Sequence, residues 1–459
     1  MKKLRTISVC LIFLVLLACS ISANRIPWKI DKNKESVILL LTDIHFDPFT
    51  NGEALKLLTK PLDEWDDVLN KTGKSNLPDY GEDTNYRLFS SALGELKFIS
   101  DDIDCAIICG DLMCHNFDEK FKKYCGSSSR CTEFAIKTIE YEALSLQQAL
   151  PGKPIYFVIG NNDSDNGNYN IKPGGEMLKE LSIFFKTVSK DSQASIDFAT
   201  GGYYAITFPF ADNEELIVLN DVYWHEYYKS EGEDENVPEN EIQWLKNVLD
   251  NTAADGKKAI IAMHIPPGID AYLASKDKHC IGNDGFLKQR YSSELMALLN
   301  THNEVLEYMF AGHTHFDDFR VFSDKKGIPF FVADIIPSIS PVHGNNPAFE
   351  LALIGKNGQI EDKAVYNLVK SADINTEAEW KLEYTFDSAF DYTAYSPENL
   401  YSLADSINKD QNVLNKFLLF YTAGNDSLSK QIFNNCTAYK CVLKSPDDMS
   451  YTFCACGKQ

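Results

Sequence analysis

Seven acidic, amide and imidazole side chains stand directly after short apolar runs, and their types suit metal-assisted hydrolysis. In chain order they are Asp43 and His45, Asp111, Asn161, His264, and His313 with His315. Each group stands where a buried strand is expected to end. Open α/β sheets place their ligand sites outside the carboxyl ends of their strands. We therefore expect these side chains to converge on one site.

The residue types predict a site for two divalent cations. Two ions about 3.5 to 4 Å apart need a carboxylate between them, imidazole and amide ligands around them, and a shared water as nucleophile. Imidazole and carboxylate ligands together suit zinc, manganese or iron, whereas calcium and magnesium prefer more oxygen. Glycine precedes Asp111, Asn161 and His313 and is expected to allow a sharp backbone turn there. Zinc is the metal that we expect.

The chain between these residues has the pattern of an α/β fold. Short aliphatic and β-branched runs predict buried strands at 37–41, 105–109, 155–159, 216–219, 259–263 and 305–310. Amphipathic stretches at 133–149 and 239–249 predict helices between the strands. A further helix is expected to begin at Ser396-Pro397, because serine caps helices and proline fits the first turn.

Longer motifs surround the candidate ligands. They are Gly110-Asp111-Leu112-Met113-Cys114-His115, His264-Ile265-Pro266-Pro267-Gly268, Gly312-His313-Thr314-His315 with Asp318-Phe319, and Pro337-Ser338-Ile339-Ser340-Pro341 with Asn346-Pro347. This pattern resembles the calcineurin-like metallophosphoesterase superfamily and, within it, the acid sphingomyelinase-like phosphodiesterases. The resemblance implies a four-layer α/β/β/α sandwich over residues 34–370. It also implies a small helical, disulfide-bearing C-terminal subdomain over 371–459.

The resemblance also implies individual roles. One metal would be held by Asp43, His45, Asp111 and His315, and the other by Asp111, Asn161, His264 and His313. Asp111 would then bridge the ions, and a hydroxide shared by them would attack phosphorus in line with the departing oxygen. His115 matches a family histidine placed to protonate the departing alkoxide.

Asn162 is the departure from the superfamily pattern, which usually has histidine at this position. Asparagine can donate a hydrogen bond but cannot supply the proton that an alkoxide needs. We therefore expect His115 to be the general acid and Asn162 to position the phosphate. The sequence Gly160-Asn161-Asn162-Asp163 also resembles the version in fungal endopolyphosphatases.

Three functions are compatible with the sequence. The first is a secreted phosphodiesterase for a small phosphodiester or a membrane-lipid head group, such as sphingomyelin, a choline-nucleotide conjugate or a nucleotide. The second is an endopolyphosphatase or a phosphate-releasing nucleotide hydrolase. The third is a secreted binding protein that keeps metal only for stability. No basic tract is evident that could hold a long polyanion, which disfavours an endopolyphosphatase.

The N-terminal segment predicts export. Residues 1–23 begin with lysines and arginine, continue with an apolar run and end in small residues, as secretory signal peptides do. Leu16-Leu17-Ala18-Cys19 also resembles a bacterial lipobox, so that Cys19 would be lipidated in such a host. The mature chain is then secreted, lysosomal, periplasmic or lipid-anchored, depending on the organism.

Net charge and cysteine content constrain the partners. The formal charge is −22 and becomes −25 without the basic leader, which disfavours a nucleic-acid partner. We expect a monomer that has at most peripheral membrane contact. Close cysteines in an exported chain predict disulfides, first between Cys125 and Cys131 and between Cys436 and Cys441. Glycosylation motifs begin at Asn70, Asn425 and Asn435.

Overall fold

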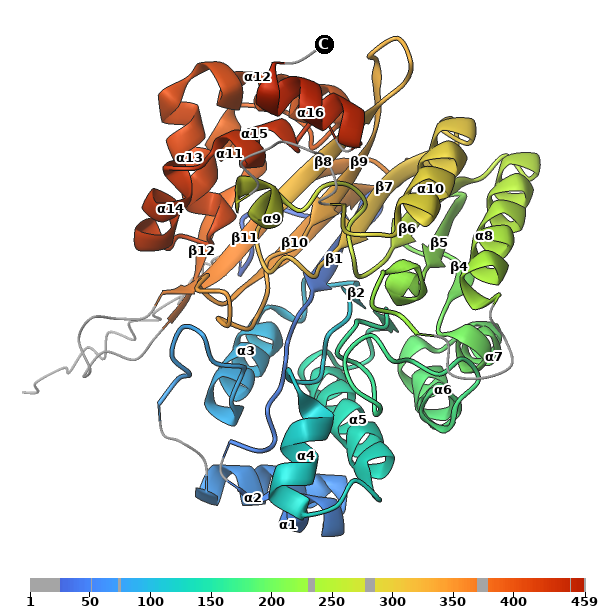
Figure 1. Ribbon diagram of the computed structural model, residues 1–459, viewed down its shortest axis with the longest axis vertical. Coiled ribbons are helices and arrows are strands. Elements are labelled where there is room, and N and C mark those ends of the chain that lie inside the picture. The colour runs from blue at the N-terminus through green and yellow to red at the C-terminus, as the bar shows by residue number, and fades with distance from the viewer. Residues whose placement is uncertain are drawn as a thin grey trace, which may run out of the picture.

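A computed structural model describes residues 25–50, 52–72, 76–229, 236–276, 285–369, 379–445 and 447–457. The predicted signal peptide lies outside the described residues. Two six-stranded sheets form the centre of the fold, and helices surround them (Figure 1). The fold is therefore of the mixed α/β class that the sequence predicts.

The first sheet has the strand order β12-β11-β10-β1-β2-β3. Strands β1, β2 and β3 are parallel, and β10, β11 and β12 extend the sheet in antiparallel pairs. Their bounds are β1 Glu35–Leu41, β2 Cys105–Ile108, β3 Ile155–Phe157, β10 Ala348–Gly355, β11 Ile360–Val369 and β12 Glu379–Thr385. The sheet thus continues into the portion beyond residue 371.

The second sheet has the order β4-β5-β6-β7-β9-β8, with parallel pairing from β5 to β9 and an antiparallel strand at each edge. Its strands are β4 Tyr204–Thr207, β5 Glu214–Val218, β6 Lys258–Ala262, β7 Leu306–Ala311, β8 Asp318–Ser323 and β9 Pro329–Ile335. All six predicted strands are present. Strands β4 and β8 to β12 were not predicted.

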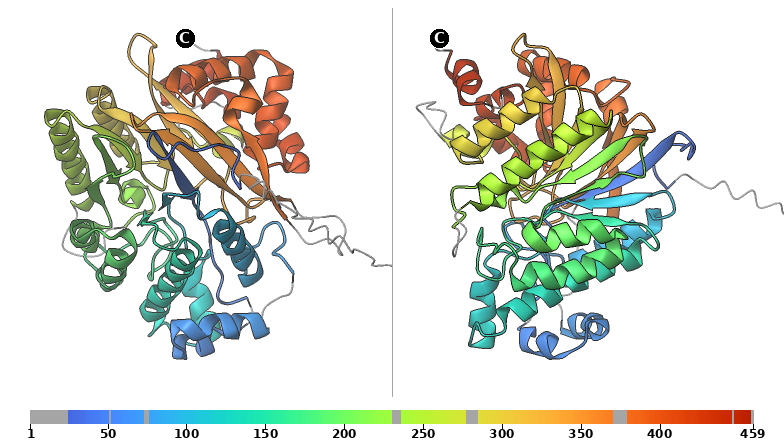
Figure 2. Two further views of the ribbon diagram at one scale, coloured as in Figure 1. Left: turned by 180° about the vertical axis from the view of Figure 1, so that it is seen from behind. Right: turned by 90° about the vertical axis from the view of Figure 1, so that its right-hand side faces the viewer.

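The two sheets pack face to face, as the right-hand view of Figure 2 shows. A buried lysine crosses between them: Lys363 of β11 lies 2.9 Å from Asp334 of β9 and 3.0 Å from Glu350 of β10. One continuous apolar core contains residues of both sheets, including Val37 to Leu41 and Ala259 to Met263. The two sheets therefore share one buried apolar core.

The helices cover the outer faces of the sandwich. Helices α5 and α8 correspond to the two predicted amphipathic stretches. The bounds up to α10 are α1 Ala54–Thr59, α2 Trp65–Thr72, α3 Tyr86–Ile99, α4 Phe117–Cys125, α5 Cys131–Ala149, α6 Glu176–Ser189, α7 Ser192–Gly201, α8 Val237–Ala254, α9 Ala271–Lys276 and α10 Gln289–Thr301, with 3-10 turns at Leu62–Glu64 and Asp221–Trp224. Helices α3, α5 and α6 lie on the side of the first sheet, and α8 and α10 on the side of the second (Figure 1).

The C-terminal portion is helical after β12, as predicted. Its helices are α11 Phe386–Phe390, α12 Pro397–Lys409, α13 Gln411–Tyr421, α14 Asp426–Phe433, α15 Thr437–Cys441 and α16 Asp448–Cys456. Helix α12 begins as expected, because the Ser396 side chain accepts a hydrogen bond from the Asn399 amide and Pro397 occupies the first turn. It packs against β8 and β9.

The predicted disulfide pairs are wrong. A disulfide joins Cys441 to Cys454 and so ties α15 to α16. Cys125, Cys131 and Cys436 are free thiols. Cys436 and Cys441 lie at opposite ends of the short helix α15, and side chains five residues apart on a helix point in different directions. Cys125 ends α4, and Cys131 begins the next helix, α5. In neither predicted pair did a short separation in the sequence indicate a disulfide.

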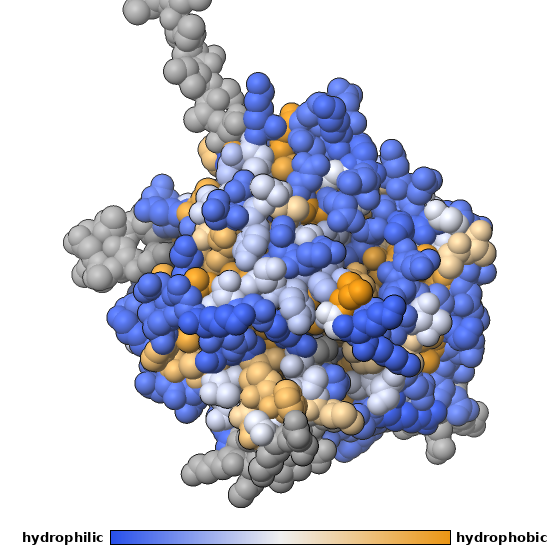
Figure 3. All heavy atoms as spheres, turned by 90° about the horizontal axis from the view of Figure 1, so that it is seen from above, coloured by the Kyte–Doolittle hydropathy of each residue, from blue (hydrophilic) through white to orange (hydrophobic). Residues whose placement is uncertain are grey.

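The surface at one end of the molecule is mostly polar. Figure 3 looks down on the end that carries the C-terminal helices, where hydrophilic side chains dominate and apolar ones form small separate groups. Within the described ranges, no helix has both the length and the hydrophobicity needed to cross a membrane.

Candidate metal centre

Both sheets contribute to one site, because the carboxyl ends of five strands meet at the same edge of the sandwich. Asp43 and His45 follow β1, Asp111 follows β2, and Asn161 lies just beyond β3, all in the first sheet. From the second sheet, His264 follows β6, and His313 and His315 follow β7. The structure therefore brings all seven predicted ligands together.

The backbone at this edge is unusual. Five of the seven candidate ligands have left-handed backbone, with φ of 48° at Asp43 and at His45, 55° at Asp111, 68° at His313 and 69° at His315. Such values are uncommon for residues other than glycine and concentrate at functional sites. The sharp turns that were expected at the preceding glycines are thus largely made by the ligands themselves.

The neighbouring glycines are needed mainly for close approach. Gly110 does have a positive φ of 89°, and a Cβ atom there would lie 2.7 Å from Nδ1 of His264. At Gly312 a Cβ would lie 1.9 Å from the Thr42 hydroxyl and 2.7 Å from Oδ2 of Asp43. Only glycine lets these two loops pass so close to the ligands.

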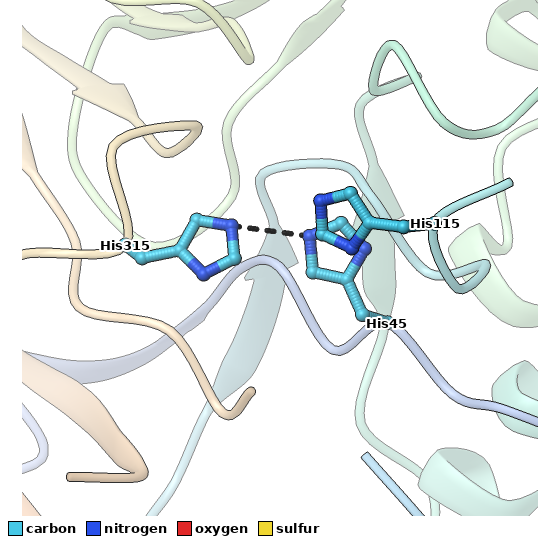
Figure 4. A group of neighbouring side chains, drawn as sticks. All are labelled: His45, His115 and His315. Atoms are coloured by element: carbon cyan, nitrogen blue, oxygen red, sulfur yellow. Dashed lines mark hydrogen bonds between the residues drawn. The ribbon is translucent and has the colours of Figure 1, made fainter. Parts of the chain in front are cut away.

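The first predicted ligand group is assembled around Asp43. Its Oδ1 atom lies 3.3 Å from Nε2 of His315 and 3.5 Å from Nε2 of His45. The two Nε2 atoms are 3.1 Å apart, with the His45 and His315 rings stacked (Figure 4). Asp111 completes the group, with Oδ2 3.6 Å from Nε2 of His45.

The second group is assembled around Asn161. Its Oδ1 atom lies 2.9 Å from Nε2 of His264 and 2.9 Å from Nδ1 of His313. Oδ2 of Asp111 is 3.4 Å from Nε2 of His264. The same carboxylate oxygen therefore faces both groups, which is the geometry that a bridging ligand requires.

The donor atoms fit bound cations. Asp43 Oδ1 is buried and has no hydrogen-bond partner among the described residues, although a buried carboxylate oxygen normally needs one. Nδ1 of His45 donates to the carbonyl of Met113 at 3.0 Å, and Nδ1 of His264 donates to that of Cys109 at 2.7 Å. These bonds leave the Nε2 lone pairs of both rings directed into the site, as in metal-binding histidines.

The electrostatics of the site favour positive charge. Burial by itself would lower the pKa of His45 and His264, but Asp43 and Asp111 raise them to about 9 and about 10. Burial and the neighbouring His264 lower the pKa of His313 to about 3. The carboxylates thus hold protons on two of the imidazoles, and divalent cations would displace those protons on binding.

His115 lies at the edge of the first group. Its ring stacks on His45 with 4.1 Å between ring centroids and also lies near His315 (Figure 4). Its Nδ1 donates to Oδ1 of Asp83 at 2.7 Å, which leaves Nε2 on the opposite side of the ring. Burial would raise the pKa of Asp83, but His115 and Lys120 lower it, so this carboxylate is ionised and orients the imidazole.

Asn162 contacts the bridging carboxylate. Its backbone N–H donates to Oδ1 of Asp111 at 2.7 Å, and its side-chain amide donates to Oδ2 at the same distance. Only 4% of the residue is exposed. In this structure Asn162 therefore orients Asp111 through its backbone N–H and one N–H of its amide, and its role in positioning the phosphate stays a prediction.

Three further residues shape the centre, and the sequence analysis missed them as site residues. Asp163 accepts backbone N–H bonds from Asp111, Leu112, Met113 and Gly160, and so fixes two ligand loops at once. Asp221 does the same for the backbone of His264 and Ile265. His343 lies 4.4 Å from His315 between ring centroids. Asp221 follows the predicted strand at 216–219 and Asp163 stands beside the Gly-Asn motif, so the pattern that selected the ligands could have found both. His343 lies on a turn between β9 and β10, and no strand-end pattern indicates it.

A cavity of about 580 Å³ opens beside the metal centre. His313 and His343 line its inner end, and the aromatic rings of Phe286, Tyr421 and Tyr439 line its walls. Tyr421 and Tyr439 come from the C-terminal helical portion, so that portion forms part of the space next to the ligands. The volume is in the range of small-molecule binding sites.

His225 near the centre predicts acid sensitivity of the fold. It is buried and stacked on Tyr169 at 4.1 Å, and burial together with Lys288 lowers its pKa to about 4. A histidine that is neutral when folded is protonated more readily when unfolded, so its contribution is complete above pH 6.5 and is lost as pH falls towards 4. From pH 7 to 5 the free energy of unfolding should fall by up to about 2 kcal/mol through this residue.

Urea unfolding of the wild type and of His225→Gln at pH 7 and pH 5 measures this contribution. We expect the variant to lose less stability than the wild type over this interval. Equal losses in the two proteins would show that His225 is not responsible.

The fold and the site together define a class of protein, the metal-dependent hydrolases of phosphoric esters. Residues 36–317 match the family model described as calcineurin-like phosphoesterase, and residues 329–459 match that of the acid sphingomyelin phosphodiesterase C-terminal region. The chain belongs to the calcineurin-like phosphoesterase family and carries the C-terminal region of the acid sphingomyelinase-like enzymes. The predicted fold class and family are thereby confirmed. The family uses divalent metals.

Named relatives support the enzyme class. The chain is 26% identical over 340 residues to human cyclic GMP-AMP phosphodiesterase SMPDL3A, covering 70% of this chain and 71% of the relative. It is 23% identical to human acid sphingomyelinase-like phosphodiesterase 3b over 90% of this chain and 89% of the relative. Sphingomyelin phosphodiesterase B of Dictyostelium discoideum is 24% identical over 91% of this chain and 64% of its own length. The chain is therefore a hydrolase of the phosphodiesterase type.

A dimetal phosphatase from Danio rerio is 13% identical, with a TM-score of 0.44 over 72% of this chain and 95% of the other.

Proposed function

We propose that this protein is an exported phosphodiesterase that uses two divalent metal ions, zinc in the native state, to hydrolyse a small phosphodiester. The observation that carries the proposal is the position of Asp111, whose Oδ2 faces His45 at 3.6 Å and His264 at 3.4 Å. A carboxylate oxygen that faces two ligand groups stands where a ligand shared by two ions would stand. Export is supported by the leader pattern at residues 1–23. N-terminal sequencing of the native protein tests that part of the proposal.

The chain's residues divide the work. Asp43, His45, Asp111 and His315 would hold one ion, and Asp111, Asn161, His264 and His313 the other. When bound, two such ions lower the pKa of a shared water and neutralise charge on the phosphoryl oxygens. His115, oriented by Asp83, protonates the oxygen that leaves. Asn162 and Asp163 hold Asp111 and its loop in position by the hydrogen bonds described above.

The cavity favours a small substrate. Its aromatic walls suit an apolar or planar group, and Asp270, Lys276 and Arg320 are the charged residues in its lining. Arg320 is paired with Asp318 at 2.6 Å. A long polyphosphate would need several unpaired cations, so this lining favours a smaller substrate. Sphingomyelin, cyclic GMP-AMP and a choline-nucleotide conjugate are all phosphodiesters, and the relatives' names include the first two.

An activity screen tests the function. The metal-loaded protein is incubated with sphingomyelin, cyclic GMP-AMP, CDP-choline, ATP and polyphosphate between pH 4 and 8. We expect a phosphomonoester product, such as phosphocholine or a nucleoside monophosphate. Shortened polyphosphate as the main product would instead support an endopolyphosphatase, and inactivity towards every diester would favour a binding protein.

Metal removal provides an independent prediction. Dialysis against a strong chelator should abolish hydrolysis, and added zinc should restore it as the metal content returns to two ions per chain. The apo protein should also unfold at a lower temperature, because ligands that bind only the folded state stabilise it. Metal analysis, activity and thermal unfolding are measured on the same samples. Full activity with less than one ion per chain would contradict the proposal.

A further inference from the structure

His343 occupies a place from which it can reach a bound substrate. It lies between β9 and β10, in the segment that contains Pro337 to Pro341 and Asn346-Pro347. His343 is exposed, and it lines the cavity together with His313. Its ring is perpendicular to that of His315 at 4.4 Å and is 6.3 Å from that of His115. The imidazole is therefore next to both the metal ligands and the proposed acid.

The backbone around His343 is held firmly on both sides. Residues 341–344 form a turn closed by the Gly344 N–H, which donates to the carbonyl of Pro341 at 2.9 Å. Before the turn, the N–H of Ser340 donates to the carbonyl of Asp43 at 3.1 Å. After it, the side chain of Asn425 donates to the carbonyl of Gly344 at 2.7 Å. The position of His343 is thus set by the first ligand loop and by the C-terminal helices together.

The ring of His343 contacts His315, but its nitrogen atoms take no part in the hydrogen bonds that hold the described part of the fold. Within the part of the chain that the structure describes, neither ring nitrogen of His343 forms a hydrogen bond. Nδ1 of His45, His115 and His264 each has a partner. Among the described residues, His315 has a partner only at Nε2, and its unpartnered Nδ1 is buried, whereas His343 is exposed to the cavity. An imidazole keeps at least one N–H donor in every protonation state. A donor on a fixed turn, exposed to the cavity beside the ligands, is available to an anionic group bound there.

Asn162 leaves this task open. It stands where the superfamily pattern has a histidine, and one N–H of its buried amide is already donated to Oδ2 of Asp111. We propose that His343 is a substrate-contacting residue, whose ring N–H donates a hydrogen bond to the phosphoryl group from the cavity side. The inference rests on the proposed function for the location of the phosphoryl group. It assigns a contact to a residue outside the two-metal motifs.

Phosphate affinity tests this contact without relying on turnover. Binding of inorganic phosphate to the metal-loaded protein is measured by calorimetry for wild type, His343→Ala, His343→Gln and the surface control Lys325→Ala. A hydrogen bond to a charged group corresponds to roughly 10- to 100-fold in affinity. We expect His343→Ala to bind phosphate about that much more weakly, His343→Gln to recover part of the loss, and Lys325→Ala to match wild type. The metal content should stay at the wild-type value in all four.

Kinetics separate the contact from other roles. Because the hydrogen bond is to the phosphoryl group, His343→Ala should lower kcat/KM by similar factors for an alkyl diester and for bis(p-nitrophenyl) phosphate. Unchanged phosphate affinity in His343→Ala would overturn the inference, and so would a loss of metal. If wild type hydrolyses neither ester but His343→Ala still weakens phosphate binding, the proposed function fails and the contact stands.

Discussion

Asp111→Ala is expected to abolish phosphodiester hydrolysis, with a fall in kcat/KM on the order of 10³-fold or more. The reason is that Oδ2 of Asp111 faces both ligand groups, so its loss removes one ligand from each ion. Metal analysis should show fewer than two ions per chain at zinc concentrations that saturate the wild type. The measurement is therefore steady-state kinetics together with metal content on one preparation.

Folding must be checked alongside this variant. Asp111 also accepts two hydrogen bonds from Asn162, and their loss is expected to loosen that loop. Asp111→Asn preserves the shape of the side chain and removes its charge, so it should fold and still fail to hold both ions. The matched control is Asp101→Asn, whose exposed carboxylate pairs only with Arg25 among the described residues and should leave activity unchanged. A fully active Asp111→Asn enzyme would rule out the bridging role.

His115→Ala is expected to slow hydrolysis of an alkyl diester by roughly 10²- to 10⁴-fold, the range typical of general acid catalysis. The loss should nearly disappear with bis(p-nitrophenyl) phosphate, because a nitrophenolate leaves without protonation. Metal content should not change, because neither of the two proposed ligand groups includes His115. The two kcat values, measured in parallel, give the test.

Asp83→Asn provides a graded version of the same experiment. Its carboxylate receives the His115 N–H at 2.7 Å, so the amide should misorient the ring and lower kcat on the alkyl diester by a smaller factor. The pH profile on this substrate should change as well, because the charge beside the imidazole is gone. Equal losses on both esters in His115→Ala would instead mean that His115 supports the site and does not donate the proton.

The candidate ligands could be selected from the sequence because each depends on a local pattern, and the structure brings them together. An apolar run followed by Asp43, Asp111 or His264 predicts where a strand ends. The residue type then indicates whether a carboxylate oxygen or an imidazole nitrogen is available there as a ligand. The helix start at Ser396-Pro397 is local for the same reason, and the structure confirms it. Strands β4 and β8 to β12 were missed. For the edge strand β12, Glu379–Thr385, the reason is that exposed polar residues alternate with buried ones, which gives a weaker apolar pattern than that of a buried parallel strand.

The disulfides depended on contacts that no short pattern contains. Cys454 lies on a different helix from its partner Cys441. Cys436 is nearer in the sequence, but its side chain and that of Cys441 point in different directions from α15. The spacing of cysteines in the sequence cannot decide which of them pair, because the pairing depends on how the two helices pack.

The residue types of the metal centre, the class of its chemistry and the α/β pattern were thus determined by the sequence itself. Only the tertiary structure showed that the ligands come from two sheets and that left-handed backbone at five of them turns the side chains inward. It also showed that the side chain of Asn162 donates a hydrogen bond to Asp111. His343, from a turn far away in the sequence, lines the cavity beside the candidate metal centre. The physical reason is that a strand end is encoded by its neighbours in the chain. The packing of one strand end against another is set by the folded core as a whole.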